Sequence, residues 1–168
     1  TTNSSGVTAG TLYTAGQTVS VQSILAAISS ATSARFDMAI TPGTPTLSIT
    51  AGQDQVSNSA TSLPIRPTVI VQDGFNNVWT SGQTVQYVVV TGSGTISSST
   101  SHTGSGGTSE VDWKLGVGTG LHQLEVSLLG QSNSTLTFNA SATNPTADTI
   151  AVFGGTGQSA TVNAATAA

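Results

Sequence analysis

Apolar and polar residues alternate along most of this chain, the pattern of β-strands with one buried face. Glycine and asparagine residues that favour turns separate the alternating runs, for example at 73–77, 92–94 and 104–107. Short strands at this spacing predict an all-β, antiparallel sandwich or barrel. The apolar positions predicted to face inward are Val69, Val71, Val85, Tyr87, Val89, Val111, Trp113, Leu115, Leu124, Val126, Leu128, Leu136, Phe138 and Ala140.

One stretch does not alternate cleanly. Residues 21–30 place Ile24, Leu25 and Ile28 at positions i, i+1 and i+4, which is compatible with one face of a helix. The same residues also fit the end of a strand followed by a loop. The sequence leaves both interpretations open.

A segment of about ten residues occurs twice, beginning at Thr46 and again at Thr149, 103 residues later. That separation is about the length of one small β-sandwich domain. Residues 1–41 resemble the strands that close the intervening repeat. In that alignment Tyr13 matches Trp113, Val19 and Val21 match Leu124 and Val126, and Phe36 matches Phe138.

A link containing proline follows each of the two matching blocks, at 41–45 and 143–146. These links predict three parts. Residues 1–41 are the C-terminal strands of a partial domain, and residues 42–145 are a complete domain whose sandwich spans 46–143. Residues 146–168 are the opening strand of a further domain, or a donor strand.

Composition narrows the class of protein. Only 6% of residues are charged, the net charge is −4, and there is no cysteine. Three basic residues cannot form a phosphate-binding face, so we expect no nucleic-acid partner. No apolar run approaches the ~20 residues of a spanning helix, so we expect no membrane insertion. Charge-poor chains rich in Ser and Thr are common among surface-layer, pilus and fibre proteins, which predicts an extracellular, cell-surface or virion-surface location.

Several motifs in 46–143 occur in the order found in bacterial Ig-like domains of the invasin and intimin type. They are Gly52-Gln53-Asp54-Gln55, Leu63-Pro64, Asp73-Gly74-Phe75-Asn76-Asn77-Val78, Gly82-Gln83-Thr84-Val85-Gln86-Tyr87, Thr91-Gly92-Ser93-Gly94, Val111-Asp112-Trp113-Lys114-Leu115-Gly116 and Thr137-Phe138-Asn139-Ala140-Ser141-Ala142. The chain resembles that family, although the segment 105–108 departs from its shorter turn. The resemblance implies one complete Ig-like sandwich with partial Ig-like segments at both ends, used as a spacer or adhesive module. It implies no catalytic residues.

The sequence offers little catalytic or metal-binding chemistry. His102 lies in a Ser/Gly loop and His122 opens a strand, and neither has the neighbours of a nucleophile or zinc site. We therefore expect no enzyme and no cofactor. An alternative hypothesis is Ca²⁺ at a domain junction, because Asp54 and Asp148 lie near the predicted boundaries.

The other acidic residues have simpler interpretations. Asp73 lies in a turn, where its carboxylate can accept backbone N–H groups. Glu110, Asp112 and Glu125 alternate with apolar residues and should face outward. No dense Asp/Asn loop of the kind that binds Ca²⁺ is present in the sequence.

The aromatic residues and sequons give further expectations. Trp113, Tyr87 and Phe138 should be core residues rather than a sugar-stacking platform. Trp79 and Phe75 flank a turn, and either one, if exposed, is a candidate contact with a neighbouring molecule. Sequons mark Asn3, Asn133 and Asn139 as acceptor sites if the source glycosylates exported proteins, with Asn139 facing outward.

The partial repeats at the two ends predict how the chain associates with its neighbours. A sandwich without all its strands leaves unpaired edges and an open apolar face. The candidate interface residues are Phe36, Met38 and Ile40 in the N-terminal block and Ile150, Val152 and Phe153 in the C-terminal block. Covalent neighbours in a longer chain could cover them. Alternatively, the C-terminal strand of one subunit completes the next subunit, giving a head-to-tail filament.

We therefore expect a structural, non-enzymatic Ig-like subunit or repeat of an extracellular fibre, filament or adhesin. Its expected partners are copies of itself or neighbouring Ig-like repeats, together with a host-cell or surface glycan. The alternatives are a virion component, such as a tail fibre or capsid decoration, and a carbohydrate-binding accessory module.

Overall fold

The structure, a computed structural model, describes residues 4–5, 13–29, 32–80, 82–131, 134–144, 154–157 and 159. Within these ranges strands are the only regular secondary structure. No helix among the described residues is long and apolar enough to cross a membrane. The strands are β1 (Ser20–Ser29), β2 (Thr32–Ile40), β3 (Thr46–Ala51), β4 (Gln55–Asn58), β5 (Thr68–Gln72), β6 (Thr84–Thr91), β7 (Thr95–Ile96), β8 (Thr100–His102), β9 (Thr108–Glu110), β10 (Trp113–Lys114), β11 (Gly120–Leu128) and β12 (Thr135–Thr143).

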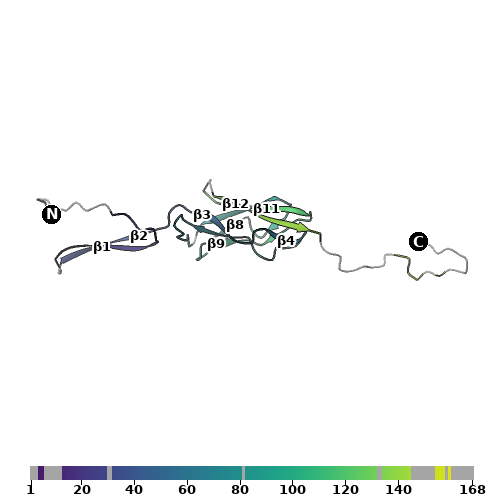
Figure 1. The fold of residues 1–168 in the computed structure, drawn as a ribbon, viewed down its shortest axis with the longest axis horizontal. Helices are drawn as coiled ribbons and strands as arrows, with labels where there is room; N and C mark the ends of the chain where they lie inside the picture. The colour runs from purple at the N-terminus through teal and green to yellow at the C-terminus, as the bar shows by residue number, and fades with distance from the viewer. Residues whose placement is uncertain are drawn as a thin grey trace.

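Strands β3 to β12 form a sandwich (Figure 1). One sheet has the order β4-β12-β11-β6-β8, the opposing sheet has the order β3-β5-β9, and β7 pairs with β10 at the side. All pairings are antiparallel except that of β4, which runs parallel to β12. The first copy of the repeated segment therefore serves both sheets: β3 joins one, and after a turn β4 joins the other.

Most of the core of the sandwich consists of residues that alternation placed inward, and Leu47, Leu63 and Ala142 complete it. Val69, Val71, Val85, Leu124, Val126 and Phe138 are fully buried, and Tyr87 and Trp113 are nearly so. Val89 and Leu136 are half-buried and pack against this core. Because strand side chains alternate between faces, period-two patterning identified most of the core.

Residues 20–29 form strand β1, so the helical interpretation of this stretch is wrong. β1 pairs with β2 in an antiparallel hairpin in which Ile24 lies opposite Phe36. The corresponding pair in the sandwich is Leu124 opposite Phe138, on β11 and β12. The pairing also corrects the sequence alignment: Ile24, rather than Val19 or Val21, occupies the position of Leu124.

The β1–β2 hairpin and the C-terminal end of β12 lie at opposite ends of the sandwich. In Figure 1 the β1–β2 hairpin projects from one end of the sandwich, and β12 ends at the opposite end. The chain therefore enters the sandwich from the hairpin side and leaves it on the other.

The turn after β6 approaches β11 so closely that only glycine fits. Gly92 has a φ of 91°, and a Cβ added there would lie 2.1 Å from Nδ1 of His122. His122 is buried, and its two ring nitrogens contact the backbone N–H of Gly116 and the carbonyl of Gly118. His122 is therefore a packing residue of the sandwich that holds the 116–118 turn.

Candidate functional site: the junction and the hairpin face

The β5–β6 connection begins with a turn built around the carboxylate of Asp73. Its Oδ1 accepts the backbone N–H groups of Phe75 and Asn77, both at 2.9 Å. The amide of Asn77 also donates to both carboxylate oxygens, at 3.2 and 2.9 Å. The turn role predicted for Asp73 is thus confirmed, and its side chain is buried beneath its own loop.

The same carboxylate also holds the link that joins the hairpin to the sandwich. Gly43 donates its N–H to Oδ2 of Asp73 at 2.8 Å. The carbonyl of Gly43 accepts the indole N–H of Trp79 at 3.1 Å. Both backbone polar groups of this one residue are therefore bound to the sandwich, which orders the link between its two prolines.

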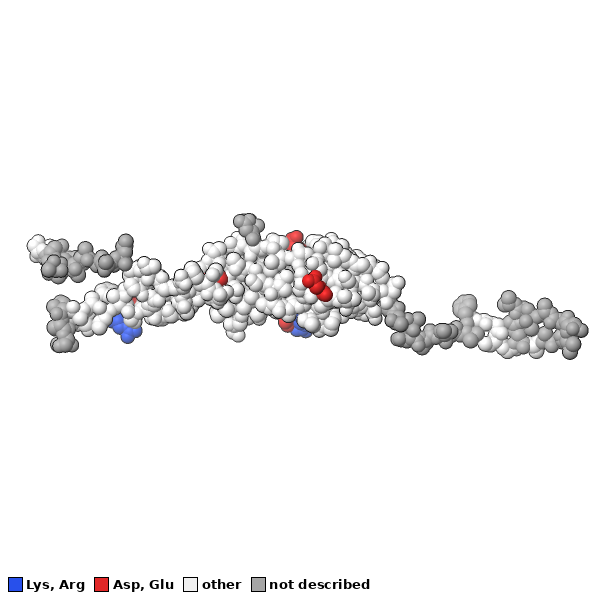
Figure 2. Space-filling view, viewed as in Figure 1, with Lys and Arg blue, Asp and Glu red and all other residues white. Residues whose placement is uncertain are grey.

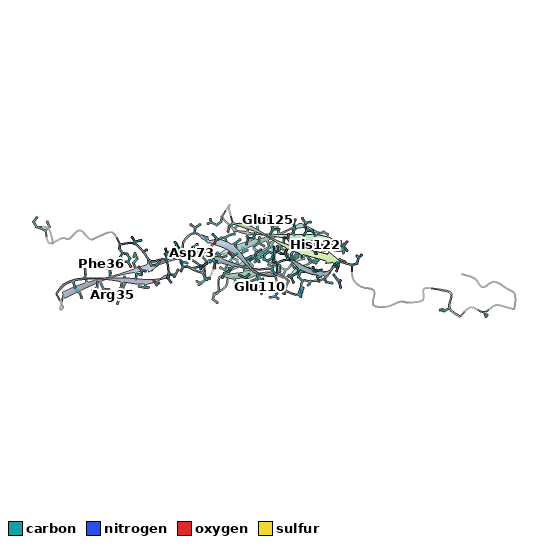
Figure 3. The ribbon with its side chains drawn as sticks, viewed as in Figure 1. Arg35, Phe36, Asp73, Glu110, His122 and Glu125 are labelled. Atoms are coloured by element: carbon teal, nitrogen blue, oxygen red, sulfur yellow. The ribbon has the colours of Figure 1, made fainter. Side chains whose placement is uncertain are left out.

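Asn77 extends these contacts to the hairpin. Its amide nitrogen donates to the carbonyl of Gln17 at 2.6 Å, and its Oδ1 accepts the N–H of Val19 at 3.1 Å. One side chain thus bonds the backbone just before β1 in the way a neighbouring strand would. We call Gly43, Asp73, Asn77, Trp79 and the segment 17–19 the junction (Figure 3, where Asp73 is labelled).

Hydrogen bonding lowers the pKa of Asp73 at the centre of the junction. The N–H of Gly43, together with the donors of Asn77 and Phe75, lowers the pKa of Asp73 to about 2, although burial opposes this shift. Asp73 is therefore a carboxylate across the physiological range. A charged acceptor strengthens the bonds it receives, so the junction is held by charge-assisted hydrogen bonds.

The hairpin carries an apolar face that the described residues leave largely uncovered. Residues opposite each other in an antiparallel pair point to the same side, so the register defines this face. We call the apolar residues on this side the hairpin face: Ile24, Ala26, Ala34, Phe36, Met38 and Ile40. The polar residues Ser20 and Gln22 lie on the same side, opposite Ile40 and Met38. Phe36 is 61% exposed, and Ile24, Met38 and Ile40 are half-buried. Three of these, Phe36, Met38 and Ile40, are sequence-predicted interface residues, and the structure brings them together.

The equivalent face of β11 and β12 is buried in the core of the sandwich. Phe138, which corresponds to Phe36, is fully buried against the opposing sheet, as is Leu124. The other side of the hairpin is more polar: Asp37 accepts the hydroxyl of Ser23 at 2.5 Å and pairs with Arg35 at 2.6 Å. Both bonds lower the pKa of Asp37, and the bond from Ser23 has the larger effect. Figure 3 shows Phe36 and Arg35 on this hairpin.

The remaining predicted site residues are distributed as follows. Ile150, Val152, Phe153, Asn3 and Asn133 lie outside the described residues, so their roles stay predictions. Asn139 lies on β12 between the buried residues Phe138 and Ala140, half-buried, and its Oδ1 accepts a bond from Gln123 at 3.1 Å.

Part of the second repeat copy is described, and it repeats a backbone feature of the first. In the first copy Gly52 and Asp54 both have positive φ, at 87° and 55°. In the second copy the matching residues, Gly155 and Gly157, have φ of 80° and 70°. The two copies therefore share positive φ at the same two positions.

Two of the acidic residues form ion pairs on the surface, whereas Asp148, one of the two residues of the Ca²⁺ hypothesis, lies outside the described residues. Glu110 and Asp112 are exposed on the outside of the sandwich and both bind Arg66, at 2.7 Å each. In the described residues no cluster of three or more His, Asp or Glu side chains forms a metal site. Figure 2 shows how few charged side chains interrupt the visible surface.

The aromatic residues divide as predicted. Trp113, Tyr87 and Phe138 are core residues. Trp79 is half-buried and its indole N–H is committed to Gly43, so it is part of the junction. Phe75 is 59% exposed on the Asp73 turn and stays a candidate contact with a neighbouring molecule.

Sequence reasoning did not find the junction. The turn motif 73–77 signalled that Asp73 would bind backbone N–H groups, but nothing in it pointed to Gly43 or to Gln17. These partners lie 30 and 60 residues away along the chain from Asp73 and Asn77. Only the folded arrangement of link, turn and hairpin brings them into contact.

Two facing sheets around one core, with an opening strand shared between them, define an Ig-like β-sandwich. The D0–D1 domains of intimin have a similar fold, with a TM-score of 0.50 and 18% identity over 60% of this chain and 50% of that one. The adhesin InvE of Yersinia pseudotuberculosis gives a TM-score of 0.48 and 16% identity, over 65% and 35%. Domains 4 and 5 of the S-layer protein SbsC give 0.45 and 16%, over 67% and 53%.

The intimin structure confirms the fold expected from the sequence motifs, an Ig-like sandwich. The chain spans between about a third and about half of the length of the solved chains just named. No family model and no curated protein matches the sequence.

Proposed function

We propose that this chain is a structural, non-enzymatic Ig-like subunit or repeat of an extracellular fibre, filament or adhesin. Its copies join head to tail, with the C-terminal segment of one copy adding to the N-terminal hairpin of the next. The charge-poor composition, rich in Ser and Thr, supports a location at a cell surface.

One observation carries this proposal: a hairpin that repeats the pairing of β11 and β12 leaves Phe36 exposed on the side that faces the core in β11 and β12. Phe36 is exposed where Phe138 is buried. A soluble chain rarely leaves a continuous apolar face open unless another surface covers it. A two-stranded hairpin is also marginally stable alone, so a covering partner would stabilise it.

The junction supports the same proposal. A module that transmits force or sets the spacing in a fibre needs a defined angle between its units. Gly43 and Asn77 tie both the link and the hairpin to the sandwich, which fixes that angle. A contact between different surfaces at opposite ends of the molecule is heterologous and grows an open chain of subunits.

The test is the size of the full-length chain in solution, measured by light scattering and negative-stain microscopy as its concentration is raised. We expect linear assemblies of increasing length. The matched variant is Phe36→Asp, which places a charge on the hairpin face and should leave monomers with an intact sandwich by circular dichroism. A wild-type chain that stays monomeric at all concentrations would contradict the proposal.

A further inference from the structure

The contact between β4 and β12 provides a template for how one segment adds to a closing hairpin. β4 runs parallel to β12, with Gln55 opposite Ala140 and Val56 opposite Ser141. Just before β4, Asp54 donates its N–H to the carbonyl of Asn139 at 2.9 Å. The preceding strand, β3, packs over β11 and β12 and supplies the buried Leu47.

The N-terminal hairpin presents an equivalent edge. β2 pairs only with β1 among the described strands, so its other edge corresponds to the edge of β12 that receives β4. Matching Phe36 to Phe138 places Met38 at the position of Ala140. In the same way Ala39 takes the position of Ser141, whose partner in the sandwich is Val56.

The occupant is identified by the repeat. The segment from Thr149 matches the segment from Thr46, so Ile150 corresponds to Leu47 and Gln158 to Gln55. Gly155 and Gly157 already have the left-handed backbone of Gly52 and Asp54, the turn that passes the chain from β3 to β4. A Cβ added at Gly157 meets nothing within 4 Å.

We propose that residues 158–161 of a second copy, which follow the turn at 155–157, add to β2 as a parallel strand in one register. Gln158 lies opposite Met38, Ser159 opposite Ala39, and Ala160 opposite Ile40. Ile150 and Val152 of that copy then cover the hairpin face around Phe36. This inference rests on the proposed function and specifies its partner, edge and register.

Disulfide trapping tests the register, because the natural chain has no cysteine. Paired residues on neighbouring strands lie about 4.8 Å apart, within the range that a disulfide bridges. Full-length Ala39→Cys is mixed with full-length Ser159→Cys under mild oxidation. The control replaces Ser159→Cys with Ala160→Cys, which is displaced by one residue and therefore points to the other face.

We expect about tenfold more mixed disulfide from Ser159→Cys than from Ala160→Cys, given the opposite faces of the two side chains. Adding Phe36→Asp to the Ala39→Cys chain should reduce trapping to the level of random collisions. Preferential trapping of Ala160→Cys, or of Ala39→Cys with itself, would overturn the register.

The failure of this inference is distinguishable from the failure of the proposed function. If the Ala39→Cys and Ser159→Cys chains assemble together but form no mixed disulfide, the register is overturned and head-to-tail joining stays intact. A chain that forms neither assemblies nor mixed disulfides would overturn both.

Discussion

The N–H of Gly43 donates to the carboxylate of Asp73 across 2.8 Å, joining the link before the sandwich to a turn inside it. This bond matters because the same turn also holds the hairpin, through Asn77 and Gln17. A single carboxylate thereby organises a loop, a link and the start of a strand. The junction therefore connects both the link and the hairpin to the sandwich.

The first prediction concerns acid. The pKa of Asp73 falls from an ordinary value of about 3.9 in the unfolded chain to about 2 in the fold. A lowered pKa stabilises the fold above the unfolded value, and that contribution is lost as the pH falls through the folded value. Asp73→Asn should therefore be less stable than the wild type at neutral pH, and the difference should shrink between about pH 4 and pH 2.

Denaturant unfolding of both chains across this pH range measures the effect. Asp54→Asn is the control, because Asp54 is exposed and asparagine tolerates its left-handed backbone. A stability difference for Asp73→Asn that stays constant from neutral pH to about pH 2 would show that ionisation of Asp73 does not stabilise the junction.

The second prediction concerns orientation. Asn77→Ala removes the bonds to Gln17 and Val19, so the hairpin should reorient faster than the sandwich. The ¹⁵N relaxation of the amides in β1 and β2 should then give a shorter rotational correlation time than that of the sandwich amides. The wild type and the control Asn144→Ala, an exposed position just after β12, should show one common value for both parts. Equal correlation times in Asn77→Ala would mean that other contacts fix the hairpin.

The third prediction compares two phenylalanines at matching positions. Phe138 is fully buried, so Phe138→Ala should lower the free energy of unfolding by about 3–5 kcal/mol. Phe36 is exposed in the single chain, so Phe36→Ala should change the free energy of unfolding of the sandwich by less than about 0.5 kcal/mol. Self-association, measured by light scattering, should show the opposite order. Phe36→Ala should weaken self-association more than Phe138→Ala does under conditions in which both variants are folded. Strong destabilisation of the monomer by Phe36→Ala would mean that its ring already packs within the chain.

The fourth prediction concerns the turn beside His122. Gly92→Ala places a methyl group against a buried imidazole at a left-handed position, so it should destabilise the sandwich by about 1–3 kcal/mol. Gly118→Ala is the matched control, since an added Cβ there meets nothing within 4 Å. Thermal unfolding of both variants is the measurement. Equal midpoints for the two would show that the 92–94 turn can move away from His122.

The match between expectation and structure depended on how strongly each local pattern constrained the chain. Trp113 and Val126 lie in clean alternation, and both are in the core. Residues 20–29 carry apolar side chains on both faces of the strand, such as Ile24 and the exposed Leu25. Alternation there did not distinguish a strand from a helix, and it also did not indicate that Ile24 rather than Val21 would lie opposite Phe36.

By itself, the sequence determined the class of fold, the inward positions of the sandwich and the existence of a repeated opening segment. Period-two alternation and turn residues act locally, so they are legible in a linear chain. Only the tertiary structure decided that Asp73 binds Gly43, that Asn77 binds Gln17, and that Phe36 shares an uncovered face with Ile24. These relations depend on strand register and on hydrogen bonds between residues distant in sequence, and local propensity does not encode either of them.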